Sequence, residues 1–215
     1  MSVIVKRADD PRVLRTRAAV VEAARKLFLR KGYANTTMEE IAAQAGLTKR
    51  TLYNNYPDKE ALFRQIVTET MAFAEAFAKG LREEFTAAEV TAKNLRATLD
   101  DLAQRLVLGI MRPEVIALRR LLIGEAREFP AFGAAYFERA PGQVLETMAS
   151  GFERWGQRRL LRVADARIAA AQFAYLVVGE PLDRAMLVGT VPSREHVIAC
   201  AREGVETFLA RYGRG

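Results

Sequence analysis

Apolar residues recur along most of the chain with the three- and four-residue spacing of an amphipathic α-helix. One such stripe near the start consists of Leu14, Ala18, Val21, Ala24 and Phe28. Similar stripes follow at Leu95, Leu99, Leu102, Leu106 and Ile110, and at Ile198, Ala201, Val205, Phe208 and Tyr212. The sequence shows no alternation typical of β-strands, so the pattern predicts an all-α fold.

Caps, glycines and prolines predict where these helices begin and end. Gly32 stops the first helix, and two short helices are expected over about 37–45 and 48–55. The first of these has two candidate capping boxes, Thr36 with Glu39 or Thr37 with Glu40. A long helix is expected to begin at Lys59, after the break at Pro57 and Asp58.

The second half of the chain is expected to continue in the same way. We expect helices over 95–110, from Pro113 to near Pro130, and from Pro141 to about residue 159. A further helix is capped by Asp165 and runs through Gly179, with a bend or a restart at Pro181. Ser193 caps the last predicted helix, which extends to about residue 212.

The two short helices meet at the tight turn Ala45-Gly46-Leu47, a pattern typical of a helix-turn-helix. In that motif the second helix lies in the DNA major groove. Its side chains here are suited to phosphates or base edges: Thr48, Lys49, Arg50, Thr51, Asn54 and Asn55. A small helical bundle with no DNA partner also contains short helix pairs joined by an Ala-Gly turn, so this reading stays open at this point.

Charge is concentrated at the N-terminal end. The chain has 33 basic and 26 acidic residues, a net charge of +7. Residues 1–64 hold 13 basic and 7 acidic residues, a net of +6, and the remaining 20 and 19 give +1. Such an excess attracts polyanions. The alternative is a solvated basic face with no partner.

Residues 36–62, TTMEEIAAQAGLTKRTLYNNYPDKEAL, resemble the DNA-binding domain of the TetR family. The upstream segments AARKLF and GY fit the same pattern. The resemblance implies that the third helix reads double-stranded operator DNA, that Tyr53 contacts a phosphate, and that Thr37 and Lys59 are backbone anchors. Core packing of Tyr53 and plain solvation of Lys59 are the alternatives. Asn55 and Tyr56 depart from the family's usual residues, which leaves operator preference open.

Residues 120–130, RLLIGEAREFP, and 136–141, YFERAP, are similar to the C-terminal domain of the AefR-like subgroup. The resemblance implies a DNA-binding domain over 1–64 and a helical ligand-binding and dimerisation domain over 65–215. It also implies a regulator, most often a repressor, that releases a palindromic operator when a small hydrophobic or amphipathic effector binds.

Large, soft side chains on several expected helices are candidates for lining the effector site. They are Phe73, Phe77, Met111, Phe132, Tyr136, Phe152 and Trp155. The alternative for each is that it fills the core. The last two helices, about 165–187 and 193–212, are expected to form a two-fold homodimer interface as a four-helix bundle. Small residues there allow close helix packing, among them Ala169, Ala170 and Ala174.

Other protein classes find little support in the sequence. Cys200 is the only cysteine and His196 the only histidine, so we expect no disulfide, no thiolate cluster, no His-rich metal site and no catalytic triad. His196 is expected to be a cap or interface residue. We expect a cytoplasmic protein that needs no cofactor, makes no membrane contact and is not an enzyme. The remaining alternative is a helical adaptor that binds protein and has an incidentally basic N-terminus.

Overall fold

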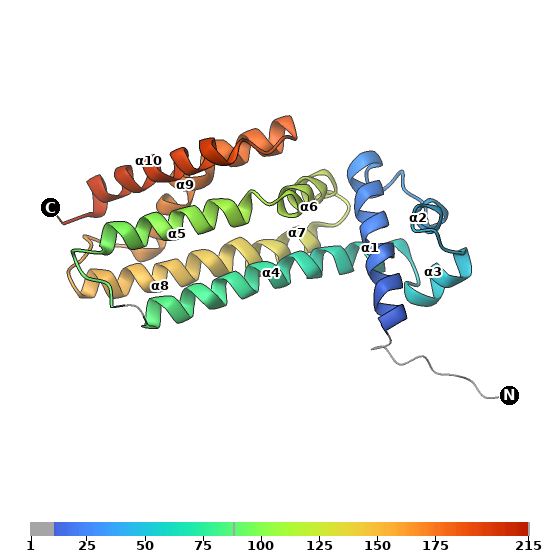
Figure 1. Cartoon of the computed structure of the whole chain (residues 1–215), viewed down its shortest axis with the longest axis horizontal. Coiled ribbons are helices and arrows are strands. Elements are labelled where there is room, and N and C mark those ends of the chain that lie inside the picture. The colour runs from blue at the N-terminus through green and yellow to red at the C-terminus, as the bar shows by residue number, and fades with distance from the viewer. Residues whose placement is uncertain (1–10, 88, 215) are drawn as a thin grey trace. The chain divides into compact units, whose positions relative to one another are not determined.

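The computed structural model describes residues 11–87 and 89–214 (Figure 1). Its α-helices are α1 Pro11–Lys31, α2 Met38–Gln44, α3 Lys49–Asn55, α4 Lys59–Ala87, α5 Leu95–Ile110, α6 Pro113–Gly124, α7 Pro130–Phe137, α8 Gln143–Gln157, α9 Ala166–Val188 and α10 Arg194–Tyr212. A short π-helical segment, Glu138–Gly142, joins α7 to α8. In the two described ranges the β pairing is one isolated bridge, Leu161 to Gly213. The predicted all-α fold is confirmed.

The described residues form two compact units. The N-terminal unit runs to Glu69 and also contains Arg120–Gly133, whereas the C-terminal unit contains Thr70–Arg119 and the chain from Ala134 onward. The chain passes between the units within α4, α6 and α7. The division expected at residue 65 did not include the segment 120–133 in the N-terminal unit.

An aromatic cluster explains why residues 120–133 belong to the N-terminal unit. The ring of Phe63 on α4 lies 6.1 Å from Phe28 and 5.3 Å from Tyr33, measured between centroids. Phe129 and Phe132 pack on the same ring at 5.6 and 5.2 Å. Burial of large aromatic side chains is a major stabilising term, so these two phenylalanines hold their segment in this core.

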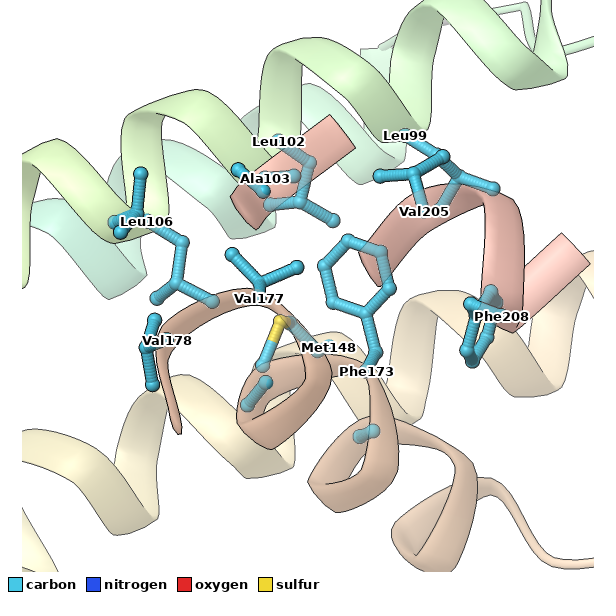
Figure 2. Close-up of a cluster of buried hydrophobic side chains, with 14 of the residues drawn as sticks. Leu99, Leu102, Ala103, Leu106, Met148, Phe173, Val177, Val178, Val205 and Phe208 are labelled. Atoms are coloured by element: carbon cyan, nitrogen blue, oxygen red, sulfur yellow. The ribbon is translucent and has the colours of Figure 1, made fainter. Parts of the chain in front are cut away.

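The core of the C-terminal unit lies between α5, α8, α9 and α10, whose side chains point toward one another in Figure 2. Leu99, Leu102 and Leu106 supply the α5 face, as their spacing predicts. Phe152 on α8 packs edge to face against Phe173 on α9 and at a tilt against Phe208 on α10, with centroids 5.5 and 5.3 Å away.

Helices α9 and α10 pack unusually closely. A β-carbon at Gly204 would lie 2.7 Å from the carbonyl oxygen of Leu176, so only glycine fits there. Ala169, Ala170 and Ala174 on α9 are buried within their own chain. These small residues therefore serve packing inside the chain.

Three of the five prolines of the second half, Pro130, Pro141 and Pro181, differ from the helix starts and stops that the sequence predicts. The helix that begins at Pro113 ends at Gly124, not near Pro130, because the Glu125 carboxylate accepts from the Tyr33 backbone N–H at 3.0 Å and fixes a turn there. Pro130 opens α7 instead, as suits a residue without an N–H.

Pro141 does not open a helix. It lies inside the π segment that joins α7 to α8, where the wider turn accommodates its missing donor. Pro181 does not restart a helix either, because α9 continues through it to Val188 and ends at Gly189, whose φ is 83°.

Candidate nucleic-acid interface and ligand cavity

The turn between α2 and α3 is held by its backbone. The N–H of Gly46 donates to the carbonyl of Ala43 at 3.1 Å, and the N–H of Leu47 donates to that of Ala42 at 2.9 Å. This pair of bonds is a Schellman motif, which needs a left-handed residue. Gly46 supplies it with φ at 67°, and the space around it is open. Glycine is therefore favoured here by the backbone angle and not by a lack of space for a side chain.

The N-terminal cap of α2 settles the choice between the two capping boxes. The Thr37 hydroxyl accepts from the Glu40 N–H at 3.2 Å, and the Glu40 carboxylate accepts from the Thr37 N–H at 3.1 Å. Thr36 instead is buried and donates to the Gly32 carbonyl at 2.9 Å. Lys31 also pairs with Glu40, and these contacts lower the pKa of that carboxyl, with Lys31 first.

Helix α3 is anchored on one side and open on the other. Leu52 is fully buried and Tyr56, which caps the C-terminal end, is nearly so. Lys49, Arg50, Tyr53 and Asn54 are exposed. They form two pairs spaced by one helical turn, Lys49 with Tyr53 and Arg50 with Asn54. Tyr53 exposes 46% of its surface, so its side chain is not part of the core.

The threonines at the start of α3 order its first turn. The Thr48 hydroxyl accepts from the Thr51 N–H at 3.2 Å and lies 2.9 Å from the Thr51 hydroxyl. Asn55 is half-buried and donates back to the Thr51 carbonyl at 2.8 Å. These three side chains are thus engaged within the helix, whereas Asn54 is exposed.

Lys49 lies beside α2. Its ammonium is 3.2 Å from the Glu39 carboxylate, and the side chain remains two-thirds exposed, at 66%. The pKa of Glu39 lies below its usual value, first because its own backbone N–H donates to the carboxylate and then because of Lys49. An exposed ion pair of this kind contributes little stability, so the Lys49 ammonium can exchange Glu39 for a phosphate.

The Lys59 side chain forms hydrogen bonds within its own chain, a role that the sequence does not predict. Its ammonium donates to the carbonyl oxygens of Tyr33, Ala34 and Thr36 at 2.7, 3.3 and 2.8 Å. It also lies 4.3 Å from the centroid of the Tyr33 ring. Partial burial lowers the pKa of Lys59. The three ammonium protons therefore all face acceptors in the loop between α1 and α2.

The C-terminal unit contains a cavity with predominantly apolar walls. Its volume is about 100 Å³. Phe73 and Phe77 on α4 line it, with Tyr136 on α7 and apolar side chains of α5, α8 and α9. Of the seven candidate ligand residues, these three are the ones that the cavity brings together.

Two groups give this cavity a polar edge. The Arg119 side chain on α6 lines the cavity, and its Nε donates to the Tyr136 hydroxyl at 3.3 Å. The guanidinium carbon lies 5.8 Å from the centroid of the same ring. Arg119 was not among the ligand residues predicted from the sequence. The available signal is its place four residues after Val115 and three before Leu122, two buried positions of the same helix.

The other four candidate ligand residues lie elsewhere. Met111 and Phe152 are buried in the core of the C-terminal unit. Trp155 belongs to that core as well and lines a second hollow of about 540 Å³ with Phe85 and Arg105. Phe132 belongs to the aromatic cluster of the N-terminal unit. Periodicity cannot separate a side chain that lines a cavity from one that fills a core.

The α2–turn–α3 geometry, with a capped and exposed polar helix, places the chain in the helix-turn-helix class of DNA-binding proteins. Comparison with known proteins agrees. Residues 20–66 match the tetR family of bacterial regulatory proteins, and residues 97–214 match the C-terminal domain of AefR-like transcriptional repressors. The chain belongs to the TetR family of transcriptional regulators.

Individual relatives are consistent with this assignment. The HTH-type transcriptional repressor BepR of Brucella suis is 38% identical over 52 residues, which are 24% of this chain and 25% of BepR. A TetR-family regulator from Mesorhizobium loti is 32% identical with a TM-score of 0.78, over 95% of this chain and 100% of that one. The flavonoid-responsive regulator FrrA is 28% identical with a TM-score of 0.65, over 93% and 97%.

The matched part covers only 15% to 39% of the curated relatives' length, from YuxN of Bacillus subtilis to RutR of Escherichia coli. The family is one of regulators and not of enzymes. In the described ranges, none of the helices has the length and apolar character needed to cross a membrane.

Proposed function

We propose that this chain is a homodimeric repressor that binds a palindromic DNA operator and releases it when a small aromatic, amphipathic molecule enters the cavity of the C-terminal unit. The observation that carries this proposal is the apolar cavity with a single cationic side chain, Arg119, in its lining. Pockets that bind small molecules combine apolar walls with a few placed polar groups.

The DNA half of the proposal rests on α3. Lys49, Arg50, Tyr53 and Asn54 are exposed on a helix whose opposite side is anchored by Leu52. Arginine and lysine pair with guanine acceptors and asparagine with adenine, whereas a tyrosine hydroxyl suits phosphate. The side chains of Thr48, Thr51 and Asn55 order α3 itself. We assign to Thr37 and Lys59 the role of holding the neighbouring α2 and the α1–α2 loop in place.

The dimer half of the proposal rests on exposed apolar surface. Along α9 and just after it, large apolar side chains are exposed: Ile168, Tyr175, Leu176, Leu187, Val188 and Val191. Leu187 is the most exposed of them at 83%. We infer that these side chains belong to an interaction surface, because large exposed apolar areas mark such sites. A two-fold dimer covers it and presents two copies of α3 to the half-sites of a palindrome.

The ligand class follows from the cavity. Aromatic walls favour a flat ring system, and the Arg119 guanidinium with the Tyr136 hydroxyl favours a phenolate or carboxylate. FrrA is named as a flavonoid-responsive regulator, and flavonoids combine these two features. We therefore choose hydroxylated flavones as the first probes.

Ligand acts through a shift between two conformations, for which it must have different affinities. Helix α4 is the proposed lever because Lys59 at its start bonds the α1–α2 loop and Phe73 and Phe77 line the cavity.

The test is operator binding by fluorescence anisotropy, with and without a hydroxylated flavone. The flavone should weaken operator binding by the native chain, and Arg119→Leu should raise the concentration required about 10- to 100-fold, because it removes a charged hydrogen-bond donor. Arg120→Leu, an exposed neighbour, is the matched control. If Arg119→Leu releases the operator at the same flavone concentration as the native chain, the assigned effector site is contradicted. If DNA binding by the ligand-free protein does not weaken as salt rises, the alternative of a protein-binding adaptor is favoured.

A further inference from the structure

Three side chains with three different donor atoms converge between α9 and α10. The Nε2 atom of His196 lies 2.7 Å from a carboxylate oxygen of Glu180. The sulfur of Cys200 lies 3.6 Å from that nitrogen and 3.9 Å from that oxygen. These are the only histidine and the only cysteine of the chain, and their ligand atoms all fall within 4.8 Å of one another.

The arrangement has the spacing of a helical metal site. His196 and Cys200 are four residues apart, so they share one face of α10. Glu180 comes from α9, the helix that packs closely against α10 at Gly204. The second oxygen of the Glu180 carboxylate lies 3.7 Å from Arg184, which orients the first oxygen toward His196 and Cys200.

The separations fit a tetrahedral ion. With usual zinc bond lengths, a tetrahedral centre holds a histidine nitrogen and a cysteine sulfur about 3.6 Å apart and an oxygen and a sulfur at a similar distance. The observed values are 3.6 and 3.9 Å. The nitrogen and the oxygen are closer, at 2.7 Å, because they share a hydrogen bond. They need to separate to about 3.4 Å, a shift that rotation of the exposed Glu180 side chain allows.

The donor set selects the kind of metal. Mg²⁺ and Ca²⁺ prefer oxygen ligands, whereas a thiolate and an imidazole favour zinc and its neighbours in the transition series. A thiolate and a carboxylate also balance the charge of a divalent ion.

We propose that Glu180, His196 and Cys200 form a binding site for a divalent transition-metal ion of the zinc type. Water completes the tetrahedron, as in zinc sites with three protein ligands. The Cys200 thiol gives its proton to solvent as it binds. The ion joins α9 to α10 and stabilises the folded chain in proportion to its occupancy. The site is separate from the effector cavity and does not depend on the proposed function.

The experiment titrates Co²⁺ and then Zn²⁺ into the full chain, reduced and freed of metal with a chelator. Co²⁺ should bind one ion per chain with a thiolate-to-cobalt charge-transfer band and the visible bands of tetrahedral cobalt, and Zn²⁺ should remove both. Cys200→Ser should abolish the charge-transfer band. Glu180→Gln and His196→Gln should each weaken binding by more than the 10- to 100-fold that loss of an outer partner costs.

Glu195→Gln is the matched control, because it removes the same charge as Glu180→Gln. Glu195 is next to His196 in the sequence but lies on another face of α10. Its affinity should equal that of the native chain. Zn²⁺ should raise the melting temperature of the native chain and of Glu195→Gln but not of Cys200→Ser. The proposal is overturned by a cobalt complex without a thiolate band, or by equal Zn²⁺ affinity in the native chain and the three ligand variants.

Discussion

The ammonium of Lys59 donates to the carbonyl oxygen of Tyr33 across 2.7 Å and joins the start of α4 to the loop that precedes α2. Two further carbonyls of that loop, at Ala34 and Thr36, accept from the same ammonium. Leaving these carbonyl oxygens without their charged hydrogen-bond donor costs folding free energy. The position that family resemblance assigns to the DNA backbone is thus also a structural centre of the N-terminal unit.

Replacing Lys59 with methionine keeps the aliphatic stem and removes the three bonds. We expect Lys59→Met to lower the free energy of unfolding of the N-terminal unit by about 1–3 kcal/mol. Urea denaturation followed by far-ultraviolet circular dichroism, together with hydrogen exchange of the α2 amides, measures this loss. Lys26→Met, at an exposed lysine of α1, should change stability little. Native stability of Lys59→Met with a reduced salt dependence of DNA binding would show that the ammonium serves phosphate alone.

Arg50 and Lys49 should act differently on DNA. Arg50→Ala should cost about 1–3 kcal/mol for the operator and relax the choice of base at one position, as expected for a base-reading arginine. Lys49→Ala should weaken binding to all sequences and reduce the slope of log affinity against log salt by about 1. Lys79→Ala, at an exposed lysine of the C-terminal unit, should have neither effect. Identical specificity profiles for Arg50→Ala and the native chain would remove Arg50 from base reading.

Leu187 is expected to be covered by a partner subunit. Leu187→Glu places a charge in that interface and should weaken dimerisation at least about 10-fold, because burial of an unpaired charge is costly. Sedimentation velocity over a range of concentrations measures the change. Leu14→Glu, at another exposed leucine, should leave the sedimentation profile unchanged. A stable dimer in Leu187→Glu would place the interface away from the end of α9.

Thr68 lies on α4 between Lys59 and Phe73, and its hydroxyl bonds the Arg64 carbonyl at 2.8 Å. Thr68→Pro should break the helix there, at a cost of about 3 kcal/mol, and leave operator binding insensitive to the flavone. Thr68→Ala keeps the helix and should respond as the native chain does. Operator release by a folded Thr68→Pro chain at the native flavone concentration would refute the lever role of α4.

Local signals in the sequence were sufficient to predict the helix-turn-helix. The Gly46 turn and the start of α3 at about residue 48 depend on residues within one or two helical turns, and both occur as predicted. The bonds of Lys59 could not be predicted in this way, because its acceptors lie 23 to 26 residues earlier in the chain.

The C-terminal unit shows where periodicity stops being informative. Phe77 and Phe152 each lie in a stripe of apolar residues with helical spacing, yet Phe77 lines the cavity and Phe152 is buried in the core. The difference depends on how several helices pack, which a single stripe does not encode. For the same reason, the four-residue spacing of His196 and Cys200 does not by itself indicate a metal site, because the third ligand, Glu180, lies on α9.

The most direct test of the central claim is selection of bound duplexes from a random DNA pool at physiological salt, with Tyr53→Ala beside the native chain. The account predicts that the native chain enriches one palindrome and that Tyr53→Ala loses this enrichment. Selection of no sequence by the native chain freed of bound ligand, or equal enrichment by Tyr53→Ala, would contradict sequence-specific operator recognition through α3.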